Sequence, residues 1–171
     1  MGITRLNHAV LFVGDLQRSL AFYEGVLGFA RIPMEVGAIP GAAFLQAPGS
    51  TNDHDLGLFE IGAEAGPSQA GRATVGLYHL AWDVDTLLEL ERLEGVLASN
   101  DALTGATDHG TTKSLYGRDP DGLEFEIAWI IPADLLDDDA RAGRTTLRRL
   151  DLDKEKQRYG AETLGGVGIS S

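Results

Sequence analysis

The four histidines of this sequence, His8, His54, His79 and His109, are its best candidates for metal binding or acid–base chemistry. His8 and His79 stand at the same place in two similar segments, Asn7-His8-Ala9-Val10 and Tyr78-His79-Leu80-Ala81. The 171-residue chain has no cysteine, which excludes thiol catalysis, disulfides and cysteine-ligated zinc. Chemistry is therefore left to histidine, carboxylate and tyrosine side chains.

The two histidine segments belong to an internal repeat. The sequence Glu-Gly-Val-Leu occurs at 24–27 and again at 94–97, an offset of 70, and the histidines are offset by 71 because Gly14 is inserted in the first half. A histidine at one equivalent point in each half predicts a metal site on the pseudo-two-fold axis between the halves. The alternative is that each is a hydrogen-bonded core histidine on an apolar strand.

A third candidate ligand lies near the end of the second half. In residues 123–131, Glu124 and Glu126 share one strand face by two-residue alternation. Glu126 lies deeper in this apolar segment, where a carboxylate needs a cation or a hydrogen-bond donor. Two histidines and one carboxylate form a facial triad, which suits Fe(II) with open positions for substrate and dioxygen.

The elements that must position these residues form two modules of the order βαβββ, at about residues 3–62 and 74–131. In the first module, the pattern predicts a helix that Asp15 caps and Gly28 ends, and strands at 6–13, 29–35, 42–47 and 54–61. In the second, Asp85 is expected to cap a helix that runs to about 98. Its strands are expected at 77–84, 103–107, 112–117 and 123–131, the last after the turn Asp119-Pro120-Asp121-Gly122.

This order predicts an α+β fold, with both modules forming a curved mixed sheet around the metal site in one domain, residues 1–131. A Gly- and Ala-rich segment at 62–76 is expected to link the modules. Residues 132–171 are expected to form a charged, partly helical C-terminal extension, with a helix over 144–159. That helix is expected to pack on the module or on a partner subunit, and the alternative is a lid.

The composition limits the classes of partner. A net charge of −12 argues against nucleic acid and against anionic membranes, because both need a basic surface. No apolar run approaches the roughly 20 residues of a spanning helix, and the N-terminus lacks the pattern of a signal peptide. A cytoplasmic protein without nucleic-acid or membrane partners is therefore expected.

The paired modules, the opening Leu6-Asn7-His8-Ala9-Val10 and the Asp-Pro-Asp-Gly-x-x-x-Glu ending resemble the vicinal oxygen chelate superfamily. That superfamily includes glyoxalase I, bleomycin-resistance proteins and type I extradiol catechol dioxygenases. The resemblance covers about residues 3–131. It implies strands curled around a metal ion, with His8, His79 and Glu126 as the ligands.

Two further segments resemble the extradiol dioxygenases in particular: His54-Asp55-Leu56-Gly57-Leu58, and the His-Gly-x-Thr…Tyr pattern from His109 to Tyr116. By this resemblance, His54 is the acid/base beside the dioxygen site, and His109 and Tyr116 hydrogen-bond the catecholate. It implies an enzyme that uses Fe(II), with Mn(II) as the alternative metal, on a small aromatic diol and O2. A homodimer or higher homo-oligomer is expected. The chain departs from these enzymes in the spacing from His54 to His79 and from His109 to Tyr116, and in lacking their additional domain.

Two other functions stay open at this point. A glyoxalase- or epimerase-like lyase or isomerase would use Ni²⁺, Co²⁺ or Zn²⁺, with Glu60 as a fourth ligand. A non-catalytic module that binds an aromatic compound or an antibiotic is the other alternative, although the intact ligand set weighs against it. Taken singly, His54 could be a loop-edge residue, His109 a turn residue and Tyr116 a core aromatic.

Overall fold

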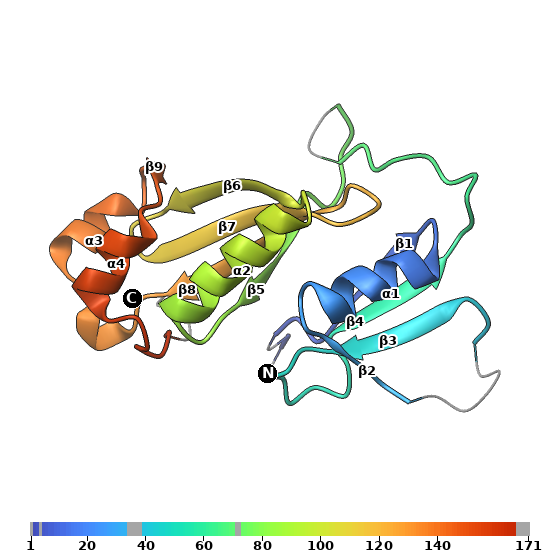
Figure 1. Cartoon of the computed structure of the whole chain (residues 1–171), viewed down its shortest axis with the longest axis horizontal. Coiled ribbons are helices and arrows are strands. Elements are labelled where there is room, and N and C mark those ends of the chain that lie inside the picture. The colour runs from blue at the N-terminus through green and yellow to red at the C-terminus, as the bar shows by residue number, and fades with distance from the viewer. Residues whose placement is uncertain (1, 4, 34–38, 71–72, 167–171) are drawn as a thin grey trace. The chain divides into compact units, whose positions relative to one another are not determined.

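The computed structural model describes residues 2–3, 5–33, 39–70 and 73–166. They divide into two compact units (Figure 1): unit 1 is Met1–Ser68 with Pro120–Gly122, and unit 2 is Gln69–Asp119 with Leu123–Ser171. The units follow the two halves of the repeat, except that the tip of the predicted turn at 119–122 belongs to unit 1. Residues 34–38, which include the end of the strand predicted at 29–35, lie outside the described residues.

Unit 1 has the order βαβββ. Its elements are β1 (Ala9–Val13), α1 (Leu16–Gly25), β2 (Ala30–Arg31), β3 (Ala42–Gln46) and β4 (Leu56–Glu60). The sheet order is β1-β4-β3-β2, with β1 and β4 parallel and the other pairs antiparallel.

Unit 2 repeats that arrangement. It contains β5 (His79–Asp83), α2 (Leu87–Ser99), β6 (Leu103–Asp108), β7 (Thr112–Arg118) and β8 (Glu124–Ile130). Its sheet order is β5-β8-β7-β6-β9, where β9 (Arg148–Arg149) comes from the C-terminal extension, and the first pair is again parallel. The prediction of an α+β fold with two βαβββ modules is confirmed.

The predicted N-cap is confirmed for α1 and was wrong for α2. Asp15 caps α1 by accepting a hydrogen bond from the Arg18 amide. Thr86, and not the predicted Asp85, caps α2, because its extended backbone directs its hydroxyl to the amide of Glu89. Helix α1 ends at Gly25 with Val26 as its C-cap, so the predicted stop at Gly28 was two residues late.

Each sheet has one face covered by the helix of its own module. In unit 1, Leu11, Val13, Leu56 and Leu58 are buried on that face, whereas Val10 and Phe12 on the other face of β1 are exposed. In unit 2, α2 lies along one face of the sheet (Figure 1), its leucines Leu87, Leu90, Leu93 and Leu97 are buried, and so are Phe125, Ile127 and Trp129 of β8. The histidine face of each sheet is therefore the face that its own helix leaves uncovered.

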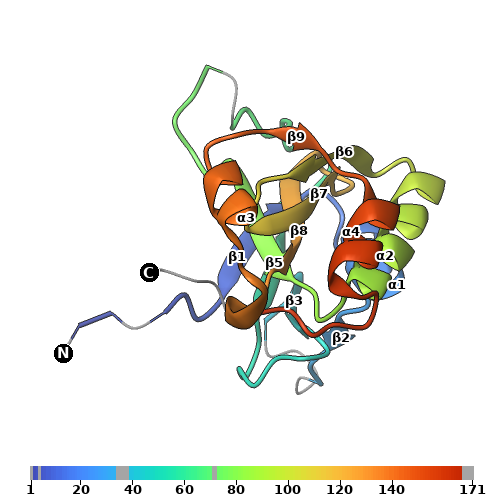
Figure 2. The same ribbon diagram turned by 90° about the vertical axis from the view of Figure 1, so that its left-hand side faces the viewer.

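The C-terminal extension packs on unit 2. It forms a 3-10 turn (Ala133–Leu135), α3 (Asp138–Gly143), β9 (Arg148–Arg149) and α4 (Leu152–Tyr159), and α4 lies beside α2 in Figure 2. The predicted helix over 144–159 was too long. Arg148 and Arg149 instead pair with β6, and a new helix begins after Asp151, whose carboxylate caps it.

Within the described residues, no helix combines the length and the apolar composition that crossing a bilayer requires.

Candidate metal and acid–base site

The register of unit 2 brings the predicted residues of that half onto one face. In the parallel pair β5–β8, His79 lies opposite Glu124 and Ala81 opposite Glu126. In the antiparallel pair β7–β8, Tyr116 lies opposite Glu126. Because paired and alternate residues share a face, His79, Glu126 and Tyr116 all lie on the face that α2 leaves uncovered.

His79 and Glu126 are in direct contact. The Nε2 atom of His79 lies 3.2 Å from Oε2 of Glu126, with the two side chains 27% and 14% exposed. The hydroxyl of Ser114 donates a 2.6 Å hydrogen bond to the other carboxylate oxygen, Oε1. Ser114 was not singled out from the sequence, although its place two residues before Tyr116 puts it on the same strand face.

The donors of this pair fit a divalent cation. Donor bonds of about 2.1 Å at a right angle separate two ligand atoms by about 3 Å, close to the observed distance. The hydrogen bond from Ser114 orients the carboxylate and leaves Oε2 for the ion. In addition, Nδ1 of His79 is buried and has no hydrogen-bond partner among the described residues.

His109 and Tyr116 form a second polar pair in the same unit. His109 lies in the β6–β7 loop, and its Nε2 is 2.7 Å from the hydroxyl of Tyr116. Burial, and then the negative charge of Glu126, raise the pKa of the Tyr116 phenol to about 12. At neutral pH the phenol is therefore protonated and can donate a hydrogen bond to an anionic oxygen.

The two predicted histidines of unit 1 lie together. The rings of His8 and His54 are 4.5 Å apart, and Phe44 packs edge-on against His54 at 4.9 Å. Nδ1 of His8 is 2.8 Å from the side-chain oxygen of Asn7, and Nδ1 of His54 is 2.8 Å from the carboxylate of Asp53. Each of these contacts engages the Nδ1 atom of its ring.

A buried carboxylate organises the loop that carries His54. Asp55 accepts hydrogen bonds from the Ala47 amide, the Ser50 hydroxyl and the Asn52 side chain at 2.7–2.8 Å. Asn52 also donates to the carbonyl of Asn7, the neighbour of His8. Burial alone would raise the pKa of Asp55, but these hydrogen bonds outweigh it and lower the pKa. The loop and the segment before β1 are thereby tied together.

Glu60 has a different place from the one expected of a fourth ligand. It lies on the face of β4 that α1 covers, with Leu56 and Leu58, and its carboxylate accepts a 2.8 Å hydrogen bond from the Leu16 amide at the start of α1. His54 precedes β4, so it does not share that strand's alternation with Glu60. Glu60 stabilises the helix start rather than facing His8.

The residue that corresponds to Glu126 in unit 1 is Gly57. In unit 2, the residue two places after the histidine, Ala81, pairs with Glu126; in unit 1 the equivalent Val10 pairs with Gly57. A Cβ atom on Gly57 would lie 3.3 Å from Phe44 and from Val10, both on the uncovered face. Unit 1 therefore offers a histidine, and no carboxylate, at the repeated position.

In the described parts of the chain, no three His, Cys, Asp or Glu side chains gather as one metal-binding group. His79 and Glu126 are together in unit 2, His109 and Tyr116 are together in the same unit, and His8 and His54 are together in unit 1. The three-ligand set of His8, His79 and Glu126 thus stays a prediction that draws on both units.

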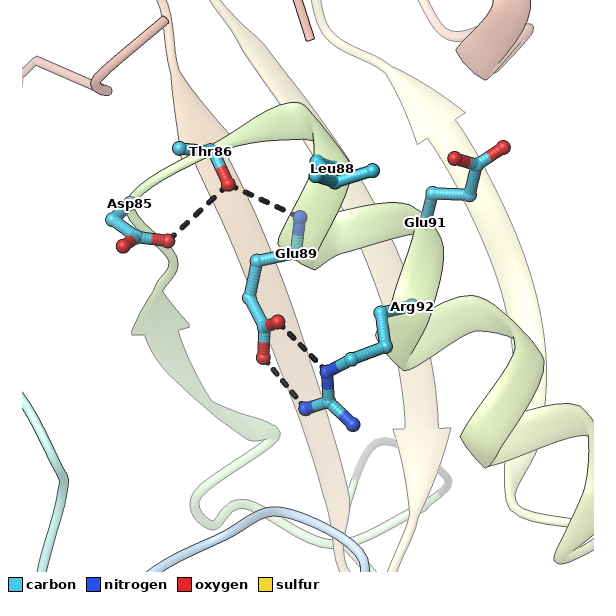
Figure 3. A pocket seen from close by; sticks show the side chains of 6 residues that line it. All are labelled: Asp85, Thr86, Leu88, Glu89, Glu91 and Arg92. Atoms are coloured by element: carbon cyan, nitrogen blue, oxygen red, sulfur yellow. Dashed lines mark hydrogen bonds and ion pairs between the residues drawn. The ribbon is translucent and has the colours of Figure 1, made fainter. Parts of the chain in front are cut away.

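A shallow hollow on unit 2 is separate from these residues. It lies at the start of α2 (Figure 3), where Asp85, Thr86, Leu88, Glu89, Glu91 and Arg92 line it. Arg92 donates two hydrogen bonds to Glu89, at 2.7 and 2.6 Å, and Thr86 is occupied as the helix cap. Glu91 pairs with Lys156 of α4, so most charged groups of this hollow already have partners, and it contains none of the candidate residues.

Comparison with known proteins gives one family. Residues 5–127 match the model of the Glyoxalase/Bleomycin resistance protein/Dioxygenase superfamily. The chain is 30% identical over 135 residues to Virulence protein STM3117 of Salmonella typhimurium, an alignment that covers 75% of this chain and 85% of that protein. It is 30% identical over 125 residues to a lactoylglutathione lyase of Neisseria meningitidis, covering 72% and 88%.

A solved structure agrees with these matches. The crystal structure of a glyoxalase/dioxygenase from Nostoc punctiforme aligns with a TM-score of 0.57 and 28% identity, over 72% of this chain and 89% of that one.

Proposed function

We propose a function for this chain from the fact that it belongs to the glyoxalase/bleomycin resistance protein/dioxygenase superfamily. That membership fixes the fold and leaves the reaction open, so the residues have to decide. The function that they support best is an extradiol dioxygenase that cleaves the ring of a catechol-type substrate with O2 and uses Fe(II).

The pairing of Gly57 with Val10 carries this proposal. Where unit 2 offers His79 and Glu126, the equivalent register of unit 1 offers His8 and a glycine. The repeat thus supplies two histidines and one carboxylate, the ligand set associated with non-haem Fe(II) and open coordination positions. A four-ligand set would need a carboxylate that unit 1 lacks at this point.

The pair of His109 and Tyr116 supports a phenolic substrate. A catechol must lose protons to chelate a metal ion through both oxygens. Imidazole can take up such a proton near neutral pH, and the neutral Tyr116 phenol can donate a hydrogen bond to the resulting oxyanion. His54, whose ring lies against His8, is proposed as the acid/base for the dioxygen side.

The overall reaction balances without a further cofactor. Both atoms of O2 enter the ring-opened product, one carbon–carbon bond beside the diol breaks, and no external reductant is consumed. When bound, Fe(II) would supply a centre that coordinates both the diol and dioxygen. The protein residues would hold the substrate oxygens and move protons.

A lactoylglutathione lyase-like activity is the second candidate, because a relative at 30% identity carries that name. It is placed second because Glu60, the carboxylate expected to complete a four-ligand site, accepts a hydrogen bond from the Leu16 amide at the start of α1 instead.

Reconstitution distinguishes the two activities. The full chain, loaded anaerobically with Fe(II), is given a panel of catechols and then air, and oxygen uptake and the yellow ring-opened product are followed. In parallel, the Ni²⁺, Co²⁺ and Zn²⁺ forms are assayed with the methylglyoxal–glutathione adduct. Ring cleavage with oxygen uptake is expected. Turnover of the adduct alone would favour the lyase and reject the dioxygenase.

The ligand assignment has a matched control on the same strand face. Glu126→Gln should weaken Fe(II) binding by at least about tenfold, measured by equilibrium dialysis, because a neutral amide is a weaker ligand than a carboxylate. Glu124→Gln removes a carboxylate that pairs with Arg118 instead and should leave Fe(II) binding unchanged. His79→Ala should abolish binding, whereas His54→Ala should retain iron and lose most turnover. Equal iron affinity for both glutamine variants would reject Glu126 as a ligand.

A further inference from the structure

We infer that the C-terminal extension, residues 132–166, holds the β6–β7 loop in the position that presents His109 to Tyr116, with Glu155 as a positioning residue. The match to the family model ends at residue 127, so this segment lies beyond the matched residues. The role of His109 rests on the proposed function, whereas the contacts that hold its loop do not.

The loop is closed at its base by a buried lysine. Lys113, 1% exposed, places its ammonium 2.5 Å from the carboxylate of Asp108 and 3.2 Å from the carbonyl of Gly110. Asp108 is its partner in the β6–β7 register and also accepts a 2.8 Å hydrogen bond from the Gly110 amide. His109 is thus flanked on both sides by residues of one polar network.

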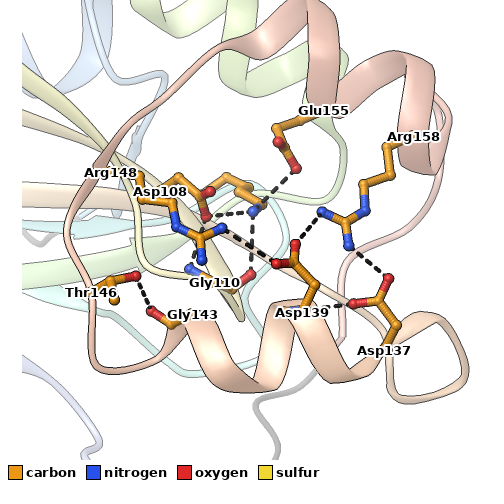
Figure 4. Close-up of polar contacts among 11 residues, drawn as sticks. Asp108, Gly110, Asp137, Asp139, Gly143, Thr146, Arg148, Glu155 and Arg158 are labelled. Atoms are coloured by element: carbon orange, nitrogen blue, oxygen red, sulfur yellow. Dashed lines mark hydrogen bonds and ion pairs between the residues drawn. The ribbon is translucent and has the colours of Figure 1, made fainter.

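The extension completes that network from outside the module. Glu155 of α4, 2% exposed, brings its carboxylate to 3.1 Å from the Lys113 ammonium, and Figure 4 shows it directed toward Asp108 and Gly110. A buried ammonium needs charged or polar partners on all sides, so Glu155 supplies part of what keeps Lys113 in place.

A second contact joins α3 of the extension to Gly110 in the β6–β7 loop. Gly110 has a φ of 78°, and a Cβ atom there would lie 2.4 Å from the carbonyl oxygen of Ala140 and 2.7 Å from Cα of Gly143. Only glycine fits between β6 and α3 at this point. Strand β9 adds a third contact, since Arg148 pairs with Asp108 at the edge of the sheet.

The extension is itself firmly attached to unit 2, which a positioning element requires. Tyr159 packs against the buried Trp129, with ring centroids 5.6 Å apart, and Lys156 forms a 2.6 Å ion pair with Glu91 of α2. Arg158 joins α4 to the start of α3 through ion pairs with Asp137 and Asp139. These contacts connect α3 and α4 to each other and to unit 2, so the two helices contact the loop as one connected element.

Amide hydrogen exchange in the full chain tests this inference directly. The amides of His109, Gly110 and Thr111 are hydrogen-bonded within the loop, so their exchange reports how well it is held. Glu155→Gln keeps the side-chain volume and removes the charge. We expect these three amides to exchange at least about tenfold faster in this variant. The control is Asp153→Asn, which removes a carboxylate that is 82% exposed on the same helix and should change none of them.

A second pair of variants keeps the test decisive if Glu155→Gln unfolds. Gly143→Ala adds a methyl group 2.8 Å from Cα of Gly110 and should accelerate the same three amides, whereas Gly95→Ala in α2 adds one in open space. Unchanged loop exchange in folded Glu155→Gln, or in Gly143→Ala if the first variant does not fold, would overturn the inference.

Catechol turnover separates this inference from the proposed function. If the wild-type chain cleaves catechols, Glu155→Gln should lower kcat while Fe(II) affinity is kept. If the wild type has no such activity, the proposed function fails, and the exchange result still decides whether the extension holds the loop.

Discussion

Replacing Lys113 by methionine should destabilise unit 2 severely. Methionine keeps the unbranched apolar stem and removes the ammonium, so two carboxylates lose their shared counter-ion. The side chains of Lys113, Asp108 and Glu155 are only 1%, 12% and 3% exposed, so water cannot take the place of the cation. The Gly110 carbonyl loses a donor as well.

The magnitude follows from this burial. Removing one partner of a buried ion pair costs about 3–5 kcal/mol, because the remaining charge stays desolvated. With typical domain stabilities of about 5–15 kcal/mol, such a loss is a large part of the total. Lys154→Met, on an exposed position of α4, is the matched control and should change the unfolding free energy by less than about 0.5 kcal/mol.

Tryptophan fluorescence during urea unfolding measures this loss in the relevant unit. The chain has two tryptophans, Trp82 and Trp129, and both lie in unit 2, so the signal follows that unit. Trp129 is fully buried and packs on Tyr159 of α4, which makes the signal sensitive to the extension.

The pKa of Asp108 determines how the stability difference between the variant and the wild type should change with pH. Burial alone would raise the pKa of Asp108, but hydrogen bonds from Lys113 and from the Gly110 amide outweigh it and lower the pKa. A carboxyl with a lowered folded pKa stabilises the fold above its unfolded pKa, about 3.9, and this contribution is lost as pH falls through the folded value. Lys113→Met removes most of this contribution. The variant and the wild type should therefore differ most at neutral pH and begin to converge as the pH falls below about 4.

Two results would refute this reasoning. A loss of less than about 1 kcal/mol at pH 7 would mean that the buried carboxylates do not depend on Lys113. A difference from wild type that widens on acidification would mean that the Asp108 carboxylate is not stabilised by the ammonium.

Three further predictions concern the candidate site. Asp55→Asn should lower the unfolding free energy of unit 1 by about 2–3 kcal/mol, because three hydrogen bonds lose their charged acceptor. Urea unfolding monitored by far-UV circular dichroism measures this loss, and a value below about 0.5 kcal/mol would contradict it. Gly57→Glu places a carboxylate at the position equivalent to Glu126. It should therefore tighten Ni²⁺ or Zn²⁺ binding, measured by dialysis, by at least about tenfold and suppress catechol turnover. Unchanged affinity would count against the ligand assignment that the repeat suggests. Tyr116→Phe should keep Fe(II) bound and lower kcat/KM for catechol by about 10²-fold, because a hydrogen-bond donor to the oxyanion is lost; full activity would remove Tyr116 from the site.

The fold could be predicted because short-range patterns determine it. Alternation within one strand put Glu124 and Glu126 on the same face, and the repeat made β1 and β5 equivalent; neither step requires knowing which strands pair. The cap of α2 was missed because Asp85 and Thr86 are both good capping residues, and only the backbone conformation decides which one reaches the Glu89 amide.

What the sequence could not give depends on long-range contacts. Glu155 reads as one more charge on a solvated helix, and nothing local indicates that it pairs with the buried Lys113. The helix predicted over 144–159 was too long because Arg148 and Arg149 find partners on β6, a preference that helix periodicity does not contain. Gly57 has no local feature that marks it as the position equivalent to Glu126, and only its pairing with Val10 shows this.

The two halves of the repeat differ in the residues that they contribute to the candidate site, and so in their proposed roles. Both keep a histidine at the equivalent strand position, but the second half also has the carboxylate of Glu126, the orienting hydroxyl of Ser114 and the His109–Tyr116 pair braced by the extension. The first half has Gly57 at the carboxylate position and brings His54 from a loop that Asp55 organises. On the proposed function, substitutions in the second half should therefore change metal retention and substrate binding together. Loss of His54 in the first half should slow turnover while the metal stays bound, because proton transfer and metal binding then reside on different residues.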